Sequence, residues 1–119
     1  MGHRARAPRQ CRVDARVDAV FGALADPSRL YLVERLAVLG TATPTELADE
    51  LPITRQAVTK HLATLEQAGL VSGTREGRNT VYRPDPRPLR EAARWLEVVG
   101  AQWDARLAAL AQHVERRQA

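Results

Sequence analysis

The sequence predicts one mostly helical domain that carries a two-stranded β-hairpin and ends in a long helix. A chain of 119 residues has room for a single hydrophobic core. Hydrophobic residues make up 45% of it and aromatic residues only 4%, a composition that favours packed helices over a sandwich or barrel. Two short segments rich in Val, Thr and Tyr interrupt the helical patterns, which is typical of a hairpin.

Two helices are expected in the first third of the chain. Apolar residues recur with the spacing of one helical face at Val17, Val20, Phe21 and Leu24. Asp26 then offers an N-cap, and Pro27 suits the first helical position, where its missing N–H costs nothing. The second helix should end at Gly40 and present the stripe Leu30, Val33, Leu36 and Ala37.

Two further helices should follow, joined by a tight turn. Thr43 and Glu46 form a capping box around Pro44, and this predicts a short helix from Thr43 to about Leu51. Pro52 prevents smooth continuation, because its ring clashes with the carbonyl four residues back, and Thr54 offers a new N-cap. From Thr54 the next helix should stop at Gly69 and point Ala57, Val58, Leu62 and Leu65 inward.

The last third of the chain predicts a hairpin and then a long helix. Segments 70–74 and 80–83 read as strands around the polar turn 75–79, and Pro84, Pro86 and Pro88 interrupt regular structure. Beyond the prolines, apolar residues recur at intervals of seven at Leu89, Leu96, Trp103 and Leu110. A parallel row stands four residues further along, at Ala93, Gly100, Leu107 and Val114. Trp95 and Trp103 lie on this helix, where packing in the core or an interface is favoured over an aromatic ligand pocket.

Two short helices with a tight turn and a following hairpin define a winged helix-turn-helix. The major groove of B-DNA is about 12 Å wide and admits one helix, whose first turns meet the base edges. If Ala57, Val58, Leu62 and Leu65 point inward, the helix from Thr54 presents Arg55, Gln56, Thr59 and Lys60 outward. Arg and Lys donate to guanine, Gln pairs with adenine, and the Thr methyl can touch thymine. This pattern indicates a protein that reads double-stranded DNA.

Further DNA contacts are expected around this helix. Thr54 lies at its first turn, and Arg75, Arg78 and Asn79 lie on the hairpin, where arginine suits the backbone or the minor groove. His61 is a lower-ranked phosphate contact, and a partly buried, hydrogen-bonded histidine is an equally good interpretation.

Several segments, in their order and spacing, resemble the ArsR family of bacterial repressors. They are residues 23–29 (Ala-Leu-Ala-Asp-Pro-Ser-Arg), 46–48 (Glu-Leu-Ala), 57–62 (Ala-Val-Thr-Lys-His-Leu), 65–71 (Leu-Glu-Gln-Ala-Gly-Leu-Val) and 75–78 (Arg-Glu-Gly-Arg). The resemblance covers roughly residues 17–114 and implies a homodimer that binds a palindromic operator and usually represses. It also implies that the first and last helices form the subunit interface, which agrees with the apolar stripe. The interface residues expected are Val17, Val20, Phe21, Leu89, Leu96, Trp103, Leu107 and Leu110.

Metal-binding relatives carry ligands that this chain lacks. The segment from Thr43 to Leu51 contains no Cys or His, and the last helix offers only Asp104 and His113, nine residues apart. A closed Zn²⁺ site needs about four ligands held tetrahedrally. The sequence therefore resembles the metal-independent members of the family, and no metal or other cofactor is expected; a small-molecule effector is not indicated.

The N-terminal residues differ in composition from the rest. The formal net charge is +4, and Arg4, Arg6, Arg9 and Arg12 precede the first acidic residue. Residues 1–12 are expected to form a disordered basic arm, and residues 13–119 the DNA-binding and dimerisation domain. One cysteine, Cys11, excludes an internal disulfide, and neither a signal peptide nor a membrane span is evident, so a cytoplasmic protein is expected.

Two other classes of function were weighed against DNA binding. A winged-helix module that binds only proteins would carry acids or alanines on the outward face of the helix from Thr54, where Arg55 and Lys60 stand. An enzyme is disfavoured because no nucleophile–base, paired-carboxylate or phosphate-cradling constellation occurs in one place. The sequence therefore predicts a regulator without catalytic activity.

Overall fold

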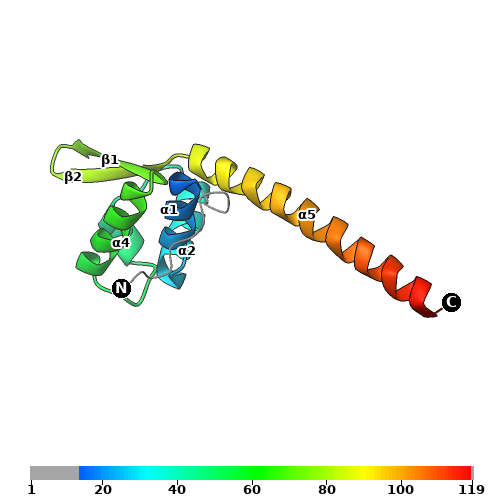
Figure 1. The fold of residues 1–119 in the computed structure, drawn as a ribbon. Coiled ribbons are helices and arrows are strands. Elements are labelled where there is room, and N and C mark those ends of the chain that lie inside the picture. The colour runs from blue at the N-terminus through cyan, green and yellow to red at the C-terminus, as the bar shows by residue number, and fades with distance from the viewer. Residues whose placement is uncertain (1–13, 119) are drawn as a thin grey trace, which may run out of the picture.

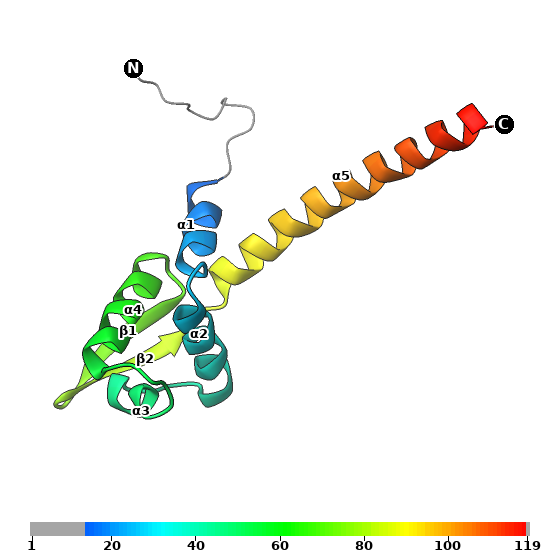
Figure 2. The same ribbon diagram turned by 90° about the horizontal axis from the view of Figure 1, so that it is seen from below.

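The computed structural model describes residues 14–118, and its fold is mostly helical. The elements in chain order are α1 (Ala15–Ala23), α2 (Pro27–Leu39), α3 (Pro44–Ala48), α4 (Arg55–Gln67), β1 (Val71–Glu76), β2 (Asn79–Pro84) and α5 (Arg87–Gln118). The two strands pair antiparallel, with Glu76 opposite Asn79 at the turn and Val71 opposite Pro84 at the other end. Helix α5 projects from the body formed by the other elements (Figures 1 and 2), and the molecule therefore measures 71 × 40 × 26 Å. The predicted fold class is confirmed.

Helix boundaries lie where the capping residues predict them. The Asp26 carboxylate accepts the N–H of Ser28 at 2.8 Å, and the capping box of Thr43 and Glu46 is closed in both directions at 2.9 and 3.2 Å. The Thr54 hydroxyl accepts the N–H of Ala57 at 3.1 Å. Gly40 and Gly69, which follow α2 and α4, have φ of 83° and 80°, a conformation that residues with a Cβ rarely adopt.

Three boundaries differ from the prediction. Helix α3 ends at Ala48 instead of Leu51, and the chain makes its turn before Pro52. Helix α5 begins at Arg87, before the last proline, because Pro88 in the first turn has no helical acceptor to miss. The predicted arm, residues 1–12, and Cys11 lie outside the described residues.

One core joins the helices of the body. Its fully buried side chains are Val20, Leu32, Leu36, Leu47, Val58, Leu62 and Leu65. Val17 and Val20, predicted at a subunit interface, are only 5% and 0% exposed because they pack inside the chain itself. For these two residues the structure corrects the sequence-based prediction.

The hairpin is fixed to the body at its inner end. Ala42 and Tyr82 exchange backbone hydrogen bonds of 3.1 and 2.9 Å, and the Glu66 carboxylate accepts the N–H of Gly73 at 3.2 Å. A Cβ on Gly73 would come within 2.9 Å of the Tyr82 ring, so glycine is required where that ring crosses β1. The hairpin therefore keeps a defined position relative to α4.

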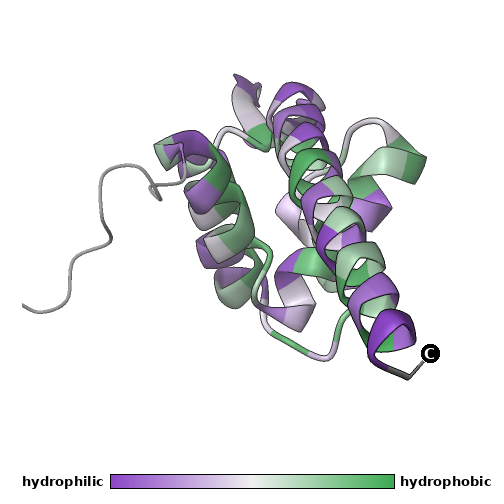
Figure 3. Ribbon diagram, turned by 45° about the vertical axis from the view of Figure 1, so that its right-hand side comes forward, coloured by the Kyte–Doolittle hydropathy of each residue, from purple (hydrophilic) through white to green (hydrophobic). Residues whose placement is uncertain are grey.

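Helix α5 leaves most of its apolar residues exposed (Figure 3). Green and purple segments alternate along it, since the apolar residues occupy one stripe and the charged residues the remaining surface. Within residues 14–118, no helix is both long enough and apolar enough to cross a membrane.

We expect the Glu50→Gln variant to be less stable than the wild type at neutral pH. Glu50 accepts hydrogen bonds from Arg35 Nε at 2.6 Å and from the Tyr31 hydroxyl at 3.0 Å, which joins the end of α3 to α2. These bonds, that of Arg35 first, lower the pKa of Glu50. A lowered pKa means that the stabilisation is present above the ordinary value of 4.5 and is lost as pH falls through the folded-state pKa.

Thermal denaturation of Glu50→Gln and wild type across pH measures this effect. The difference in Tm should be largest near pH 7 and shrink on acidification, whereas the control Glu34→Gln, a change of the same type at an exposed residue of α2, should leave Tm nearly unchanged. A pH-independent difference would contradict the assignment.

Candidate nucleic-acid interface

The outward face of α4 carries the residues that the sequence selected. Val58, Leu62 and Leu65 are fully buried, so the intervening side chains must face solvent. The residues that do so at the start of the helix are Thr54, Arg55, Gln56, Thr59 and Lys60. The Thr59 hydroxyl donates to the Arg55 carbonyl at 3.0 Å, which engages its polar atom and leaves its methyl group free to make apolar contacts.

A groove of about 330 Å³ joins this face to the hairpin and to the start of α3. Residues from the three elements line it: Thr43, Pro44 and Thr45 before and in α3, Arg55, Gln56 and Thr59 of α4, and Arg78, Asn79, Thr80 and Tyr82 of the hairpin. The fold thus brings five of the predicted DNA contacts into one concave surface. No acidic side chain is among these described lining residues, and Arg55 and Arg78 make the groove basic.

The groove contains residues that sequence reasoning missed. Thr43 was identified only as a helix cap, and Thr45 and Thr80 carried no pattern that separates them from ordinary surface threonines. Their proximity to Arg55 depends on how the hairpin packs against α4, which no local spacing encodes.

The hairpin tip orients its basic residues differently. Gly77 has φ of 63° in the turn, and Arg78 and Asn79 follow it fully exposed. The Arg75 Nε donates to the Gly77 carbonyl at 3.1 Å, so this side chain lies back along the turn. Of the predicted hairpin contacts, Arg78 and Asn79 line the groove and Arg75 does not.

His61 is held by another residue of the body. It is half-buried, and its Nδ1 lies 3.3 Å from a guanidinium nitrogen of Arg29. Because an arginine can only donate, Nδ1 accepts, and the neutral ring carries its proton on Nε2. The same guanidinium donates to the Ala23 carbonyl at 2.6 Å and to the Gly22 carbonyl at 3.5 Å. Arg29 therefore joins the C-terminus of α1 to α4, and the hydrogen-bonded interpretation of His61 is confirmed.

Comparisons with known proteins connect this geometry to a family. A family model described as a helix-turn-helix domain matches residues 24–74. An uncharacterized HTH-type transcriptional regulator of Bacillus subtilis, YuzN, is 38% identical over 87 residues, which span 67% of this chain and 95% of that protein. The HTH-type transcriptional regulator NmtR of Mycobacterium tuberculosis is 38% identical over 88 residues, spanning 69% of this chain and 72% of that protein.

A solved structure matches both the fold and the sequence. The ArsR-like transcriptional regulator from Rhodococcus sp. RHA1 superposes with a TM-score of 0.69 at 41% identity, covering 82% of this chain and 92% of that one. The chain belongs to the ArsR family. The winged helix-turn-helix of this ArsR-family regulator consists of α3, α4 and the β1–β2 hairpin.

The residues predicted at the subunit interface of the ArsR-family chain lie in different surroundings. Leu96, Trp103, Leu107 and Leu110 are more than half exposed on α5, whereas Phe21 and Leu89 are half-buried. Phe21 contacts Trp95 edge to face at a centroid distance of 5.4 Å, which packs α1 against α5. Trp95 therefore belongs to the packing of this chain, and the exposed part of α5 lies beyond it.

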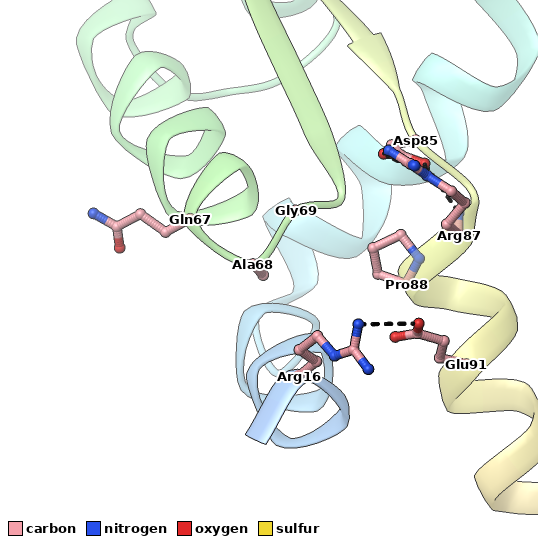
Figure 4. Close-up of a pocket in the computed structure, with 8 residues that line it drawn as sticks. All are labelled: Arg16, Gln67, Ala68, Gly69, Asp85, Arg87, Pro88 and Glu91. Carbon is pink, nitrogen blue, oxygen red and sulfur yellow. Dashed lines mark hydrogen bonds and ion pairs between the residues drawn. The ribbon is translucent and has the colours of Figure 1, made fainter. Parts of the chain in front are cut away.

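A second cavity, of about 400 Å³, lies between α1, the end of α4 and the start of α5 (Figure 4). Its charged groups are already paired: Arg16 Nη1 lies 3.5 Å from Glu91 Oε2, and Arg87 Nη2 lies 2.6 Å from Asp85 Oδ2. The bonds from Arg87 lower the pKa of Asp85 to about 2. This cavity shares no residue with the basic groove, and its Arg16–Glu91 ion pair links α1 to α5.

Within residues 14–118, no three His, Cys, Asp or Glu side chains gather closely enough to hold a metal ion. The predicted absence of a metal site remains a prediction for the whole chain.

We expect the Arg29→Ala variant to unfold more easily than the wild type. Loss of the guanidinium leaves the Ala23 carbonyl and His61 Nδ1 without their donor, and hydrogen bonds to charged groups contribute about 1–3 kcal/mol. Urea denaturation followed by circular dichroism measures the change. The control Arg94→Ala, at an exposed arginine of α5, should change the free energy of unfolding by less than about 0.5 kcal/mol. Equal effects of the two substitutions would contradict the role assigned to Arg29.

Proposed function

We propose that this ArsR-family regulator is a sequence-specific repressor that binds a palindromic operator as a homodimer. The observation that carries the proposal is the basic groove in which the start of α4 and the hairpin tip meet. A helix seated in the major groove, with a hairpin beside it, engages base edges and backbone at once.

The side chains at the start of α4 suit distinct parts of the bases. Arg55 can donate to O6 and N7 of guanine, and Gln56 can pair with N6 and N7 of adenine. Thr59, with its hydroxyl engaged by the Arg55 carbonyl, offers its methyl group to thymine. Arg78 and Asn79 suit the phosphate backbone or the minor groove, where the narrow, negative groove attracts arginine.

The exposed stripe of α5 supports the homodimer. Isolated soluble domains rarely leave a contiguous row of large apolar residues in water, and a second copy covers such a row under twofold symmetry. A twofold dimer reads two half-sites about one helical turn apart, so the operator is a palindrome. Occupation of a palindrome within a promoter blocks transcription, and the compartment we propose is the cytoplasm, where such DNA lies.

The protein-binding module remains the alternative, and no observation favours it. Such a module needs no base-reading side chains, whereas the outward face of α4 presents Arg55, Gln56 and Lys60. No cofactor, catalytic step or effector enters the proposal.

Selection from a random DNA library with the purified full-length chain tests the function directly. We expect a palindrome with two half-sites about one helical turn apart. The same palindrome, placed over a promoter, should reduce reporter expression when the chain is produced. Enrichment of no sequence, together with retention of random DNA, would contradict sequence-specific binding.

The Arg55→Ala variant should lose sequence preference at one position of each half-site. One bidentate contact to guanine contributes about 1–3 kcal/mol of discrimination, and its loss should leave the salt dependence nearly unchanged. Affinities for the selected palindrome and its single-base variants, measured at several salt concentrations, test this. The control Arg94→Ala changes the same residue type on α5 and should leave the preference intact. Uniform weakening on all sequences would show that Arg55 contacts only the backbone.

Deletion of residues 1–12 should act in the opposite way. It removes four arginines without touching α4, so selected and random DNA should weaken by similar factors. Each lost phosphate contact should flatten the plot of log K against log salt by about 0.9. A changed sequence preference would instead identify the arm as a minor-groove reader.

A further inference from the structure

A glycine stands in the middle of α5 for no reason internal to the chain. Gly100 lies thirteen residues after the start of the 32-residue helix, and a Cβ placed on it would meet nothing within 4 Å. Glycine is less favourable than alanine in a helix interior, because it loses more conformational freedom on folding. The space beside Gly100 therefore points to a contact outside this chain.

Gly100 belongs to the exposed apolar stripe of α5. Leu96, Trp103, Leu107, Leu110 and Val114 are each at least 50% exposed, and Trp103 is the most exposed of them at 68%. The neighbouring side of the helix is occupied, since Ala92 is buried and Trp95 contacts Phe21 of α1. The stripe thus begins where the contact with α1 ends and continues toward the C-terminus.

The stripe consists of two rows that complement each other in size. One row is Leu89, Leu96, Trp103 and Leu110, and the other is Ala93, Gly100, Leu107 and Val114. In an antiparallel pair of identical helices whose twofold axis passes between residues 101 and 102, each member of the first row faces one member of the second. The facing residues are then Leu89 and Val114, Leu96 and Leu107, Trp103 and Gly100, and Leu110 and Ala93.

We propose that α5 pairs antiparallel with α5 of a second copy in this register, with Trp103 of each copy seated in the notch at the partner's Gly100. Large residues meet small ones in two layers, Trp103 against glycine and Leu110 against alanine, and residues of intermediate size meet in the other two. A parallel pair would place Trp103 against Trp103 and Gly100 against Gly100, which alternates crowded and empty layers.

A second feature of the body agrees with this register. An apolar cleft of about 230 Å³ lies at the base of α5, and its walls include Val33 and Ala37 of α2 and Leu89 of α5. In the proposed register the partner's Val114 lies opposite Leu89. The C-terminal end of the partner helix therefore reaches this cleft and covers apolar surface that the single chain leaves open.

The register also separates the two winged domains. Each body lies at the N-terminal end of its own α5 (Figure 2), so antiparallel helices place the bodies at opposite ends of the pair. The inference rests on the homodimer of the proposed function and adds the residue-level register by which the copies meet.

Cysteine cross-linking of the full-length chain tests the register. In a Cys11→Ser background, chains carrying Leu96→Cys and chains carrying Leu107→Cys are oxidised separately and after mixing. The antiparallel register places these two positions in one layer, so only the mixture should give a disulfide-linked dimer. Leu96 and the partner's Leu96 would lie roughly 16 Å apart along the axis at 1.5 Å per residue, too far for a disulfide.

The outcomes separate the register from the dimer itself. Cross-linking of either variant with itself would establish a parallel pair and overturn the proposal. Absence of the mixed cross-link, with sedimentation showing dimers, would overturn the register alone. Sedimentation showing monomers of the unmodified chain at micromolar concentration would overturn the homodimer and with it this part of the proposed function.

A size exchange at the notch gives a second, independent test. Gly100→Leu should raise the dimer dissociation constant about tenfold or more, because the added side chain occupies the space of Trp103. Combining it with Trp103→Ala should restore most of the affinity. Ala105→Leu, a similar enlargement on the other side of α5, is the control and should leave dissociation unchanged. Dimerisation of Gly100→Leu as tight as that of the control would contradict the Trp103–Gly100 contact.

Discussion

Burial of one face of α4 is the constraint on which the rest of the molecule depends. Val58, Leu62 and Leu65 have no exposed surface, and a helix that commits these positions to the core must present the residues between them to solvent. Arg55, Gln56 and Thr59 are therefore oriented by packing and not by contacts of their own. The same burial requires caps at both ends, which Thr54 and Gly69 supply.

The other elements hold this face in a defined setting. Arg29 joins α4 to the end of α1, the carboxylate of Glu66 joins it to β1, and Tyr82 joins the hairpin to the loop before α3. Helix α1 in turn packs against α5 through Phe21 and Trp95. A continuous path of packed groups therefore connects the base-reading face to the helix through which we propose that two copies associate, and it keeps the spacing of the two half-sites defined.

Local rules in the sequence account for most of the fold. Asp26, Thr43, Thr54, Gly40 and Gly69 mark helix ends through their own side chains or backbone, so they could be read without tertiary information. The contacts that could not be predicted are long-range: the pairing of Arg29 with His61, the place of Thr45 in the groove, and the burial of Val17 and Val20 within the chain. A helical period shows that a face is apolar, but it does not show whether the same chain or a second copy covers it.

Photo-cross-linking from the face of α4 tests the account most directly. A benzoylphenylalanine placed at Gln56, in the groove, should cross-link to bases of the selected palindrome, at two symmetry-related positions. The same group placed at Val98, which is exposed on α5, should give no cross-link to DNA. Cross-links from position 98 and none from position 56 would contradict the central claim, because DNA would then bind a surface that the packing of α4 does not orient.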